Sequence, residues 1–367
     1  MRRIALITAV VALIPVAHSY LGVVSESSNS SLRIRTVEWL RENGAAGIVA
    51  RIESIYYTLT APSKGGPTLR ALPNVGYGVA SPGRLGGSTG AAANVEYRPA
   101  RVHALLRSAL PGEGVWHATR PALASAPPLL VTTLRDQPDY PRVVAGLAWI
   151  NTSRTTLALN PGRLEPSVEL PRGPMMVPLA RRPALLATFN SGFKLSDSKG
   201  GFVISGHTYA PMKDGQGTLV GYANGRVDVI DWSYGSIAPP RISFARQNLP
   251  LIVEDGRAAA NIENDGEWGA TVGNAVLVWR SAIGIDAHGN LIYTSGADQS
   301  VGSLARVLIQ AGAVRAMELD INSYWTSFIM YGAPGAQDPK NLLPAMERSD
   351  TRYLEPDDRD FFAVYAR

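Results

Sequence analysis

Residues 290–321, with the sequence NLIYTSGADQSVGSLARVLIQAGAVRAMELDI, decide the fold. The middle of this stretch carries apolar residues at helical spacing over 301–309, with Ser300 as a plausible N-cap and Gly312 as a stop. A strand-like run lies on each side of this helix. A strand, a helix and a strand in immediate succession predict a crossover connection within one sheet. The two strand-like runs are NLIYTS (290–295) and AMELDI (316–321).

Short strands separated by turns surround this unit, from about residue 100 to the C-terminus. Asn224-Gly225 is the strongest hairpin signal, and residues 287–290 predict a second turn. We therefore expect an α+β fold, a β-rich mixed sheet built from hairpins with one strand-helix-strand crossover near 290–321. The other strand-like runs are 129–135, 146–152, 156–162, 184–190, 201–206, 217–231, 249–258, 274–286 and 358–367.

The extreme N-terminus has the pattern of a targeting segment. Arg2 and Arg3 precede the uncharged residues 4–17, as in the charged and apolar regions of a signal peptide. Read through His18 to residue 24, the apolar stretch is long enough for a tilted membrane helix. Residues 1–24 are therefore predicted to be a cleaved signal or a retained membrane anchor, and both alternatives place the rest of the chain outside the cytoplasm.

Residues 25–98 divide into two parts. Apolar spacing predicts two short helices over 32–58, broken at Asn43-Gly44. The following residues are dense in Gly, Pro, Ser and Ala, a composition typical of an extended spacer. The folded body is expected over 99–367.

Composition excludes several classes of protein. The chain of 367 residues is 46% hydrophobic and 18% charged, enough for a sizeable core. The absence of Cys excludes disulfides, thiolate metal sites and thiol nucleophiles. A net charge of +5 is too small and too dispersed to indicate nucleic-acid binding. No cofactor is clearly indicated, and any bound ion would be a hard one such as Ca²⁺ or Mg²⁺.

Three polar residues alternate along the run at 316–322. In an extended strand, Glu318, Asp320 and Asn322 share one face. Two neighbouring carboxylates raise one pKa, which suits a general acid or a shared metal ligand. The alternative is a solvated outer face, but a crossover strand is typically covered on both sides, which favours a site.

Arg280 interrupts an otherwise apolar strand-like run. A buried arginine needs an anionic partner. That partner is either structural, from Glu318, Asp320 or Glu254, or a ligand such as a phosphate group.

A third polar group follows the run at 184–190. Asn190 stands at its end, where it would orient a ligand hydroxyl or cap the turn. Lys194, His207 and Lys213 come soon after and are candidates for a binding site. For His207, a structural hydrogen bond is the plainer alternative.

The order of these motifs resembles the phosphodiester glycosidase family over about 100–367. Asn190-Ser191-Gly192-Phe193 is similar to the family's N-G-G-F turn, and Arg280-Ser281-Ala282-Ile283-Gly284 to its R-T-A-I-G strand. Leu319-Asp320 begins the segment where the family has L-D-G-G-G. The segment 112–116 is also similar to the family's first strand.

The resemblance implies an exported hydrolase that releases a sugar from a sugar-1-phosphodiester in an envelope glycopolymer or glycolipid. Arg280 would hold the phosphodiester, and Asp320 with Glu318 would supply the acid/base or nucleophile. Asn190 would orient a hydroxyl. Asn322, His207, Lys194 and Lys213 would bind substrate at the rim of the pocket.

The chain departs from the family after Asp320. Ile321, Asn322 and Tyr324 replace glycines that would let the backbone approach a ligand or adopt positive φ. This change favours an alternative function, a non-catalytic envelope glycan-binding or scaffold protein on the same fold, in which Tyr324 or Trp325 would fill the cleft.

Overall fold

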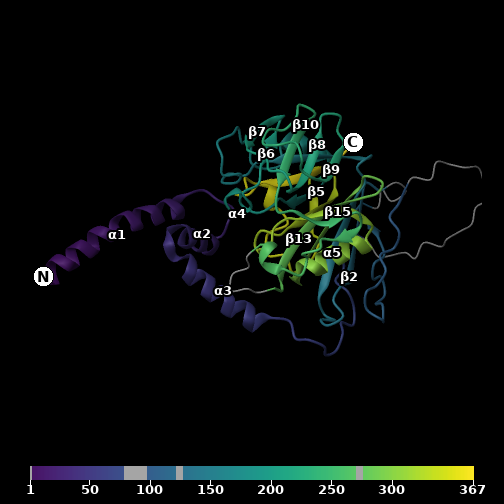
Figure 1. The fold of residues 1–367 in the computed structure, drawn as a ribbon, viewed down its shortest axis with the longest axis horizontal. Helices are drawn as coiled ribbons and strands as arrows, with labels where there is room; N and C mark the ends of the chain where they lie inside the picture. The colour runs from purple at the N-terminus through teal and green to yellow at the C-terminus, as the bar shows by residue number, and fades with distance from the viewer. Residues whose placement is uncertain (1, 78–96, 121–126, 270–275) are drawn as a thin grey trace, which may run out of the picture.

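Three antiparallel sheets form the body of the protein in a computed structural model that describes residues 2–77, 97–120, 127–269 and 276–367 (Figure 1). The first sheet has the order β1 (His117–Ala118), β2 (Leu129–Arg135), β3 (Val144–Ile150), β14 (Leu291–Gln299), β13 (Val278–Asp286), β15 (Ala313–Glu318), β11 (Leu251–Glu254), β12 (Arg257–Ala258). The second has the order β7 (His207–Ala210), β6 (Phe202–Ile204), β10 (Ile242–Gln247), β8 (Gly217–Tyr222), β9 (Val227–Asp231). The third has the order β17 (Gln337–Asn341), β16 (Phe328–Ala333), β5 (Leu185–Asn190), β18 (Phe361–Ala366), β4 (Thr155–Asn160).

The expected crossover is present in the first sheet. Helix α5 (Val301–Gln310) connects β14 to β15, and these two strands flank β13 on opposite sides. Both pair antiparallel with β13, so they run parallel to one another without being neighbours. Ser300 and Ser303 form a capping box at the start of α5, and Gly312 follows its end with a φ of 95°. The β-rich α+β class is confirmed.

One hydrophobic cluster joins the three sheets. It contains Val131 of β2, Phe189 of β5 and Leu219 of β8. Side chains of β18 alternate between this shared core, which takes Phe362 and Val364, and a second cluster on the outer face of the third sheet. Helix α5 covers the outer face of the first sheet. The three sheets therefore pack around a common hydrophobic interior.

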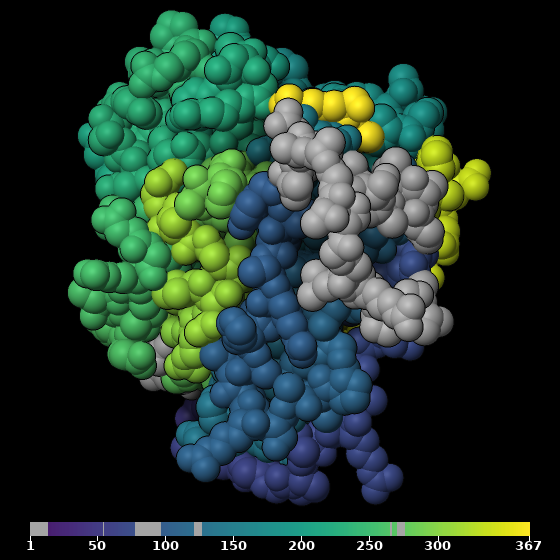
Figure 2. Space-filling view, turned by 90° about the vertical axis from the view of Figure 1, so that its right-hand side faces the viewer, coloured from purple at the N-terminus to yellow at the C-terminus, as the bar shows by residue number. Residues whose placement is uncertain are grey.

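The N-terminal residues form helices beside this body, drawn in purple in Figure 1. In Figure 2, purple atoms of this segment lie along the lower side of the body. The helices are α1 (Arg2–Ser25), α2 (Leu32–Leu40), a π-helical turn (Arg41–Ala45) and α3 (Ala46–Thr60). Gly44, with a φ of 88°, makes the predicted break between α2 and α3. No helix of the described residues is both long and apolar enough to cross a membrane.

The segment between α1 and α2 is fastened to the far end of the chain. The hydroxyl groups of Ser28 and Ser30 donate hydrogen bonds to Oδ2 of Asp358, at 2.7 and 2.6 Å. The Asn29 side chain donates to Asp357, and the Ser31 amide donates to the Tyr324 hydroxyl at 2.8 Å. Ser30 is buried. These contacts place α2 and α3 over the ends of β5 and β15, where the cavity described next lies.

Candidate active site

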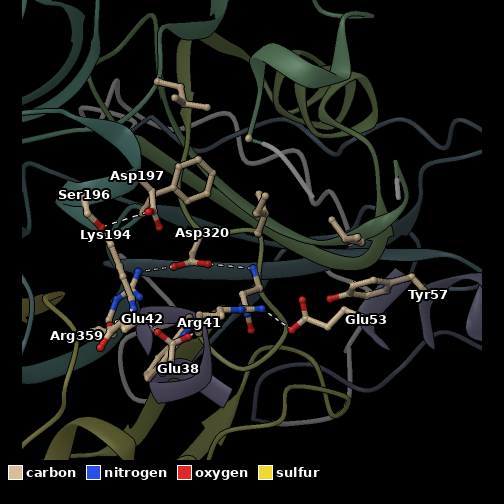
Figure 3. A pocket seen from close by; sticks show the side chains of 17 residues that line it. Glu38, Arg41, Glu42, Glu53, Tyr57, Lys194, Ser196, Asp197, Asp320 and Arg359 are labelled. Carbon is tan, nitrogen blue, oxygen red and sulfur yellow. Dashed lines mark hydrogen bonds and ion pairs between the residues drawn. The ribbon is translucent and has the colours of Figure 1, made fainter. Parts of the chain in front are cut away.

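A cavity of about 570 Å³ opens where the ends of β5 and β15 meet the N-terminal helices (Figure 3). Asp320 lies at its centre, with Lys194 and Arg359 on one side and Glu53 and Tyr57 on the other. The cavity is therefore composite, since the sheets supply one wall and α2 and α3 supply the other.

The Asp320 carboxyl group is held in a fixed position. Oδ1 accepts a hydrogen bond from the Asn322 amide at 3.0 Å, and Oδ2 accepts one from Nη2 of Arg359 at 3.0 Å. The residue is only 4% exposed. Burial raises the pKa of Asp320, and the Arg359 guanidinium opposes that rise in part. A carboxyl group with a raised pKa in a polar cavity is suited to proton transfer.

Side chains replace glycine in the turn that follows Asp320. Its carboxylate bonds to the Asn322 amide, and Oδ1 of Asn322 in turn accepts a hydrogen bond from the Tyr324 amide at 2.9 Å. None of the described residues 321–325 has a positive φ. Two consecutive turns closed by side chains therefore hold this loop, which explains how it folds without the family's glycines.

Arg359 is one of the cavity residues that the sequence analysis missed. It lies just before β18, donates to Asp320 and to the Gly192 carbonyl, and stacks on Trp325 with its Cζ 5.1 Å from the ring centroid. Its side chain is 8% exposed. Four consecutive charged residues, Asp357-Asp358-Arg359-Asp360, directly precede an apolar strand, and this pattern could have indicated the site. All four are buried in the structure, and buried charges require specific partners.

Asn190 supports the site from beneath and does not line the cavity. Its Nδ2 donates to Oγ of Ser281 at 3.0 Å, and its Oδ1 accepts from the Tyr293 hydroxyl and the Ser327 amide, both at 3.0 Å. Ser281 in turn bonds to the backbone of Asp320. The geometry makes Asn190 a positioning residue that ties together both ends of the loop carrying Asp320.

Arg280 and Glu318 lie below the cavity and form an ion pair with each other. Nη1 of Arg280 is 2.6 Å from Oε1 of Glu318, and both side chains are at most 1% exposed. The guanidinium also donates to the carbonyl groups of Gln299 and Trp268. Strand β15 ends at Glu318, so the alternation that would have put Glu318 beside Asp320 stops there. Of the two partners considered for Arg280, the structural one is present.

We expect Arg280→Met to destabilise the protein rather than to remove a substrate contact. Breaking a buried pair leaves Glu318 as an uncompensated charge, at a cost of about 3–5 kcal/mol. The measurement is the free energy of unfolding in urea. Arg315→Met is the matched control, because Arg315 lies in β15 like Glu318, and its pair with Asp228 of β9 is partly exposed, at 34% and 15%, so it should contribute at most about 1 kcal/mol. Unchanged stability with lost turnover would instead support a phosphate clamp at Arg280.

The other expected site residues divide into two groups. Lys194 and Asn322 line the cavity. His207 and Lys213 do not: His207 begins β7 in the second sheet, and Lys213 follows that strand. Both are exposed side chains on a sheet that contributes little to the cavity wall. His207 and Lys213 were predicted as site residues because they follow Asn190 closely in sequence. That prediction is wrong for both, because the chain runs away from the cavity after Asp197.

Asn248 is a second residue that the sequence did not reveal. Its Nδ2 donates to the carbonyl groups of Glu318 and Leu319, both at 2.8 Å, and its Oδ1 accepts from the Phe193 amide at 3.2 Å. A Cβ atom at Gly192 would lie 3.0 Å from Oδ1 of Asn248. Gly192 thus lets Asn248 link the turn after β5 to the end of β15.

The N-terminal helices bring charged side chains to the cavity. Glu38 of α2 forms an ion pair with Lys194, and Glu42 lies 3.3 Å from the same amine. Burial alone would raise the pKa of Glu38, but Lys194, Arg359 and Arg41 outweigh it and lower that pKa. The helical segment 32–58 therefore has a contact that the sequence analysis could not assign.

Among the described residues, no group of three or more His, Asp or Glu side chains is arranged to hold a metal ion. The expectation of a hard ion such as Ca²⁺ or Mg²⁺ stays a prediction, tested below by assays with and without those ions.

A buried carboxyl group with a raised pKa, paired with an arginine in a cavity, is a candidate catalytic site. Residues 185–320 match the model of the phosphodiester glycosidase family. The expected resemblance is confirmed over this segment, which runs from β5 to Asp320, and that family consists of hydrolases that act on sugar phosphodiesters.

The solved structures that are similar to the chain include the following two. One is the zebrafish N-acetylglucosamine-1-phosphodiester alpha-N-acetylglucosaminidase catalytic domain auto-inhibited by its pro-peptide, at 15% identity, with a TM-score of 0.43 over 66% of this chain and 85% of that one. The other is a hypothetical protein from Synechocystis, at 15% identity, with a TM-score of 0.40 over 65% of this chain and 62% of that one. No curated protein matches the chain.

Proposed function

We propose that this protein hydrolyses the bond between a sugar and its 1-phosphodiester in an envelope glycopolymer or glycolipid. The observation that carries the proposal is the buried Asp320–Arg359 pair in the cavity, within a chain whose residues 185–320 match phosphodiester glycosidases. The pair offers a proton-transfer group and a fixed cation within one hydrogen bond of each other.

Asp320 is assigned as the general base. In the reaction the bond between the anomeric carbon and the bridging oxygen breaks, and the phosphomonoester leaves with the bonding electrons. Water adds to the anomeric carbon and loses a proton to Asp320. A phosphomonoester is a stable anion and departs without a proton, so one base suffices. The raised pKa makes Asp320 a stronger base than an ordinary aspartate.

We also propose that the protein is exported. The motivating feature is the basic and apolar pattern of residues 2–17, which the structure arranges as the first part of α1. Cleavage would be tested by N-terminal sequencing of protein recovered from outside the cytoplasm. An N-terminus that still begins at residue 1 in cytoplasmic protein would contradict export.

The test of the activity is release of free sugar from a panel of sugar-1-phosphodiesters and nucleotide sugars, using the full chain with and without Ca²⁺ or Mg²⁺. We expect turnover of at least one phosphodiester and none of the matching sugar-1-phosphomonoester, in which the bridging oxygen belongs to a poorer leaving group. Stoichiometric release of sugar and phosphomonoester would show that the glycosidic bond is broken.

The scaffold alternative makes the opposite prediction. It requires that the folded protein bind envelope polymer without releasing sugar from any member of the panel. Trp325, buried to 5% exposure beneath Arg359, and Tyr324, held by the Ser31 amide, leave the cavity open, so neither plugs it as that alternative expected.

A further inference from the structure

Two cations face the cavity from the sheet side. Lys194 precedes the short helix α4 (Leu195–Ser198), and Arg359 precedes β18. The Arg359 guanidinium keeps its geometry through Asp320, the Gly192 carbonyl and the Trp325 ring. The Lys194 side chain is 24% exposed, so it is accessible from the cavity. A pair of this kind, a guanidinium held in place and a partly exposed amine, is suited to phosphate oxygens.

The Glu38 carboxylate now lies against this pair. It reaches Lys194 from α2, across 156 residues of sequence, and its side chain is 19% exposed (Figure 3). Lys194 and Arg359 both stabilise its charged form. A carboxylate has the charge and the hydrogen-bond acceptors of one edge of a phosphodiester, so Glu38 takes the Lys194 amine that a substrate phosphate would need and lies within the field of Arg359.

The N-terminal helices change the net charge of the cavity. On the sheet side, the described lining residues Lys194 and Arg359 balance Asp197 and Asp320. The N-terminal helices add the paired Arg41 and Glu53, which cancel, together with Glu38 and Glu42. The helices therefore change the net formal charge of the lining residues from zero to −2 at the place where an anionic substrate would bind, and like charges at such distances repel.

We propose that Lys194 and Arg359 form the subsite for the substrate's phosphate group, and that Glu38 occupies this subsite in the structure described here. The proposal rests on the proposed function for the identity of the ligand. It replaces Arg280, which is buried against Glu318, as the phosphate-binding arginine. Substrate binding then requires α2 to yield its contact with Lys194.

The test is calorimetric binding of inorganic phosphate and of dimethyl phosphate to the full chain. Glu38→Gln keeps the size of the side chain and removes the competing charge, so we expect it to bind both anions at least about tenfold more tightly than the wild type. Glu42→Gln is the matched control: it makes the same substitution one turn away, at a carboxylate that also contacts Lys194 but is 67% exposed. Its affinity should stay within about twofold of wild type, because exposed pairs contribute little.

A third variant identifies the cation. Lys194→Met in the Glu38→Gln background should remove the gain in affinity, while thermal melting confirms that each variant is folded. Glu38→Gln with no gain, or Glu42→Gln with an equal gain, would overturn the proposal. If the variants bind anions as expected but the protein hydrolyses no phosphodiester, the proposed function is refuted and the anion subsite is still supported. Turnover combined with unchanged anion binding would refute the subsite alone.

Discussion

Asp320→Asn is expected to reduce kcat for sugar release by a factor of about 10²–10⁴, the usual contribution of a general base. Asparagine preserves the hydrogen bond to the Asn322 amide but has no basic oxygen to accept the proton of water. The measurement is steady-state hydrolysis of the best substrate in the panel. Because burial raises the pKa of Asp320 above 3.8, activity should rise with pH through that higher value and then level off.

Asp197→Asn is the control, since Asp197 lines the same cavity and its carboxylate accepts a hydrogen bond from the neighbouring Ser196. It should change kcat by less than about threefold and leave the pH profile in place. If Asp320→Asn lost activity only in proportion to the fraction of unfolded protein, Asp320 would be a structural residue and not the base.

The largest effect on stability is expected at Asp357. Its carboxylate accepts two hydrogen bonds from Arg352, at 2.8 and 2.9 Å, and one from Arg348 at 3.1 Å, and all three residues are buried. Asp357→Asn leaves two buried guanidinium groups without their anion, which should lower the free energy of unfolding by about 3–5 kcal/mol. Urea denaturation monitored by tryptophan fluorescence measures this loss.

Glu355→Gln supplies the comparison for Asp357. Glu355 lies two residues away in the same loop but is exposed, so its substitution should stay within about 0.5 kcal/mol of wild type. Equal stability of the two variants would show that the Arg348–Asp357–Arg352 cluster contributes nothing net. Arg352 also donates to the Trp325 carbonyl at 2.8 Å, so a destabilised cluster should loosen the cavity floor as well.

Local patterns predicted the regular elements well. The crossover helix, its Ser300 cap, the turn at Asn224-Gly225 and the break at Gly44 all depend on residues close in sequence, so the sequence expresses them directly. The division of the strands among three sheets depends on contacts between distant segments. The insertion of β18 between β5 and β4 is one such contact, and no pattern of apolar residues in the sequence predicts it.

The same difference between local patterns and distant contacts explains why only part of the site was predicted. Asp320, Asn322 and Lys194 were found because strand ends and turns concentrate polar residues. The apolar run around Arg280 indicated that a buried arginine would need an anionic partner. That this partner is Glu318 and not a ligand depends on the place where β15 ends, which the sequence did not show. Arg359 and Glu38 come from opposite ends of the chain, and only the folded structure places both beside Asp320.

The position of β18 also constrains the order of folding. This strand is the last element along the chain, yet it lies inside the third sheet, and Asp358 just before it receives hydrogen bonds from Ser28 and Ser30, about 330 residues away. Strands β5 and β4 and the segment that contains Ser28 and Ser30 cannot make these contacts until residues 358–366 are available. Contacts of such long sequence separation form slowly. The third sheet and the N-terminal contacts of Asp358 are therefore expected to be among the last parts of the structure to form.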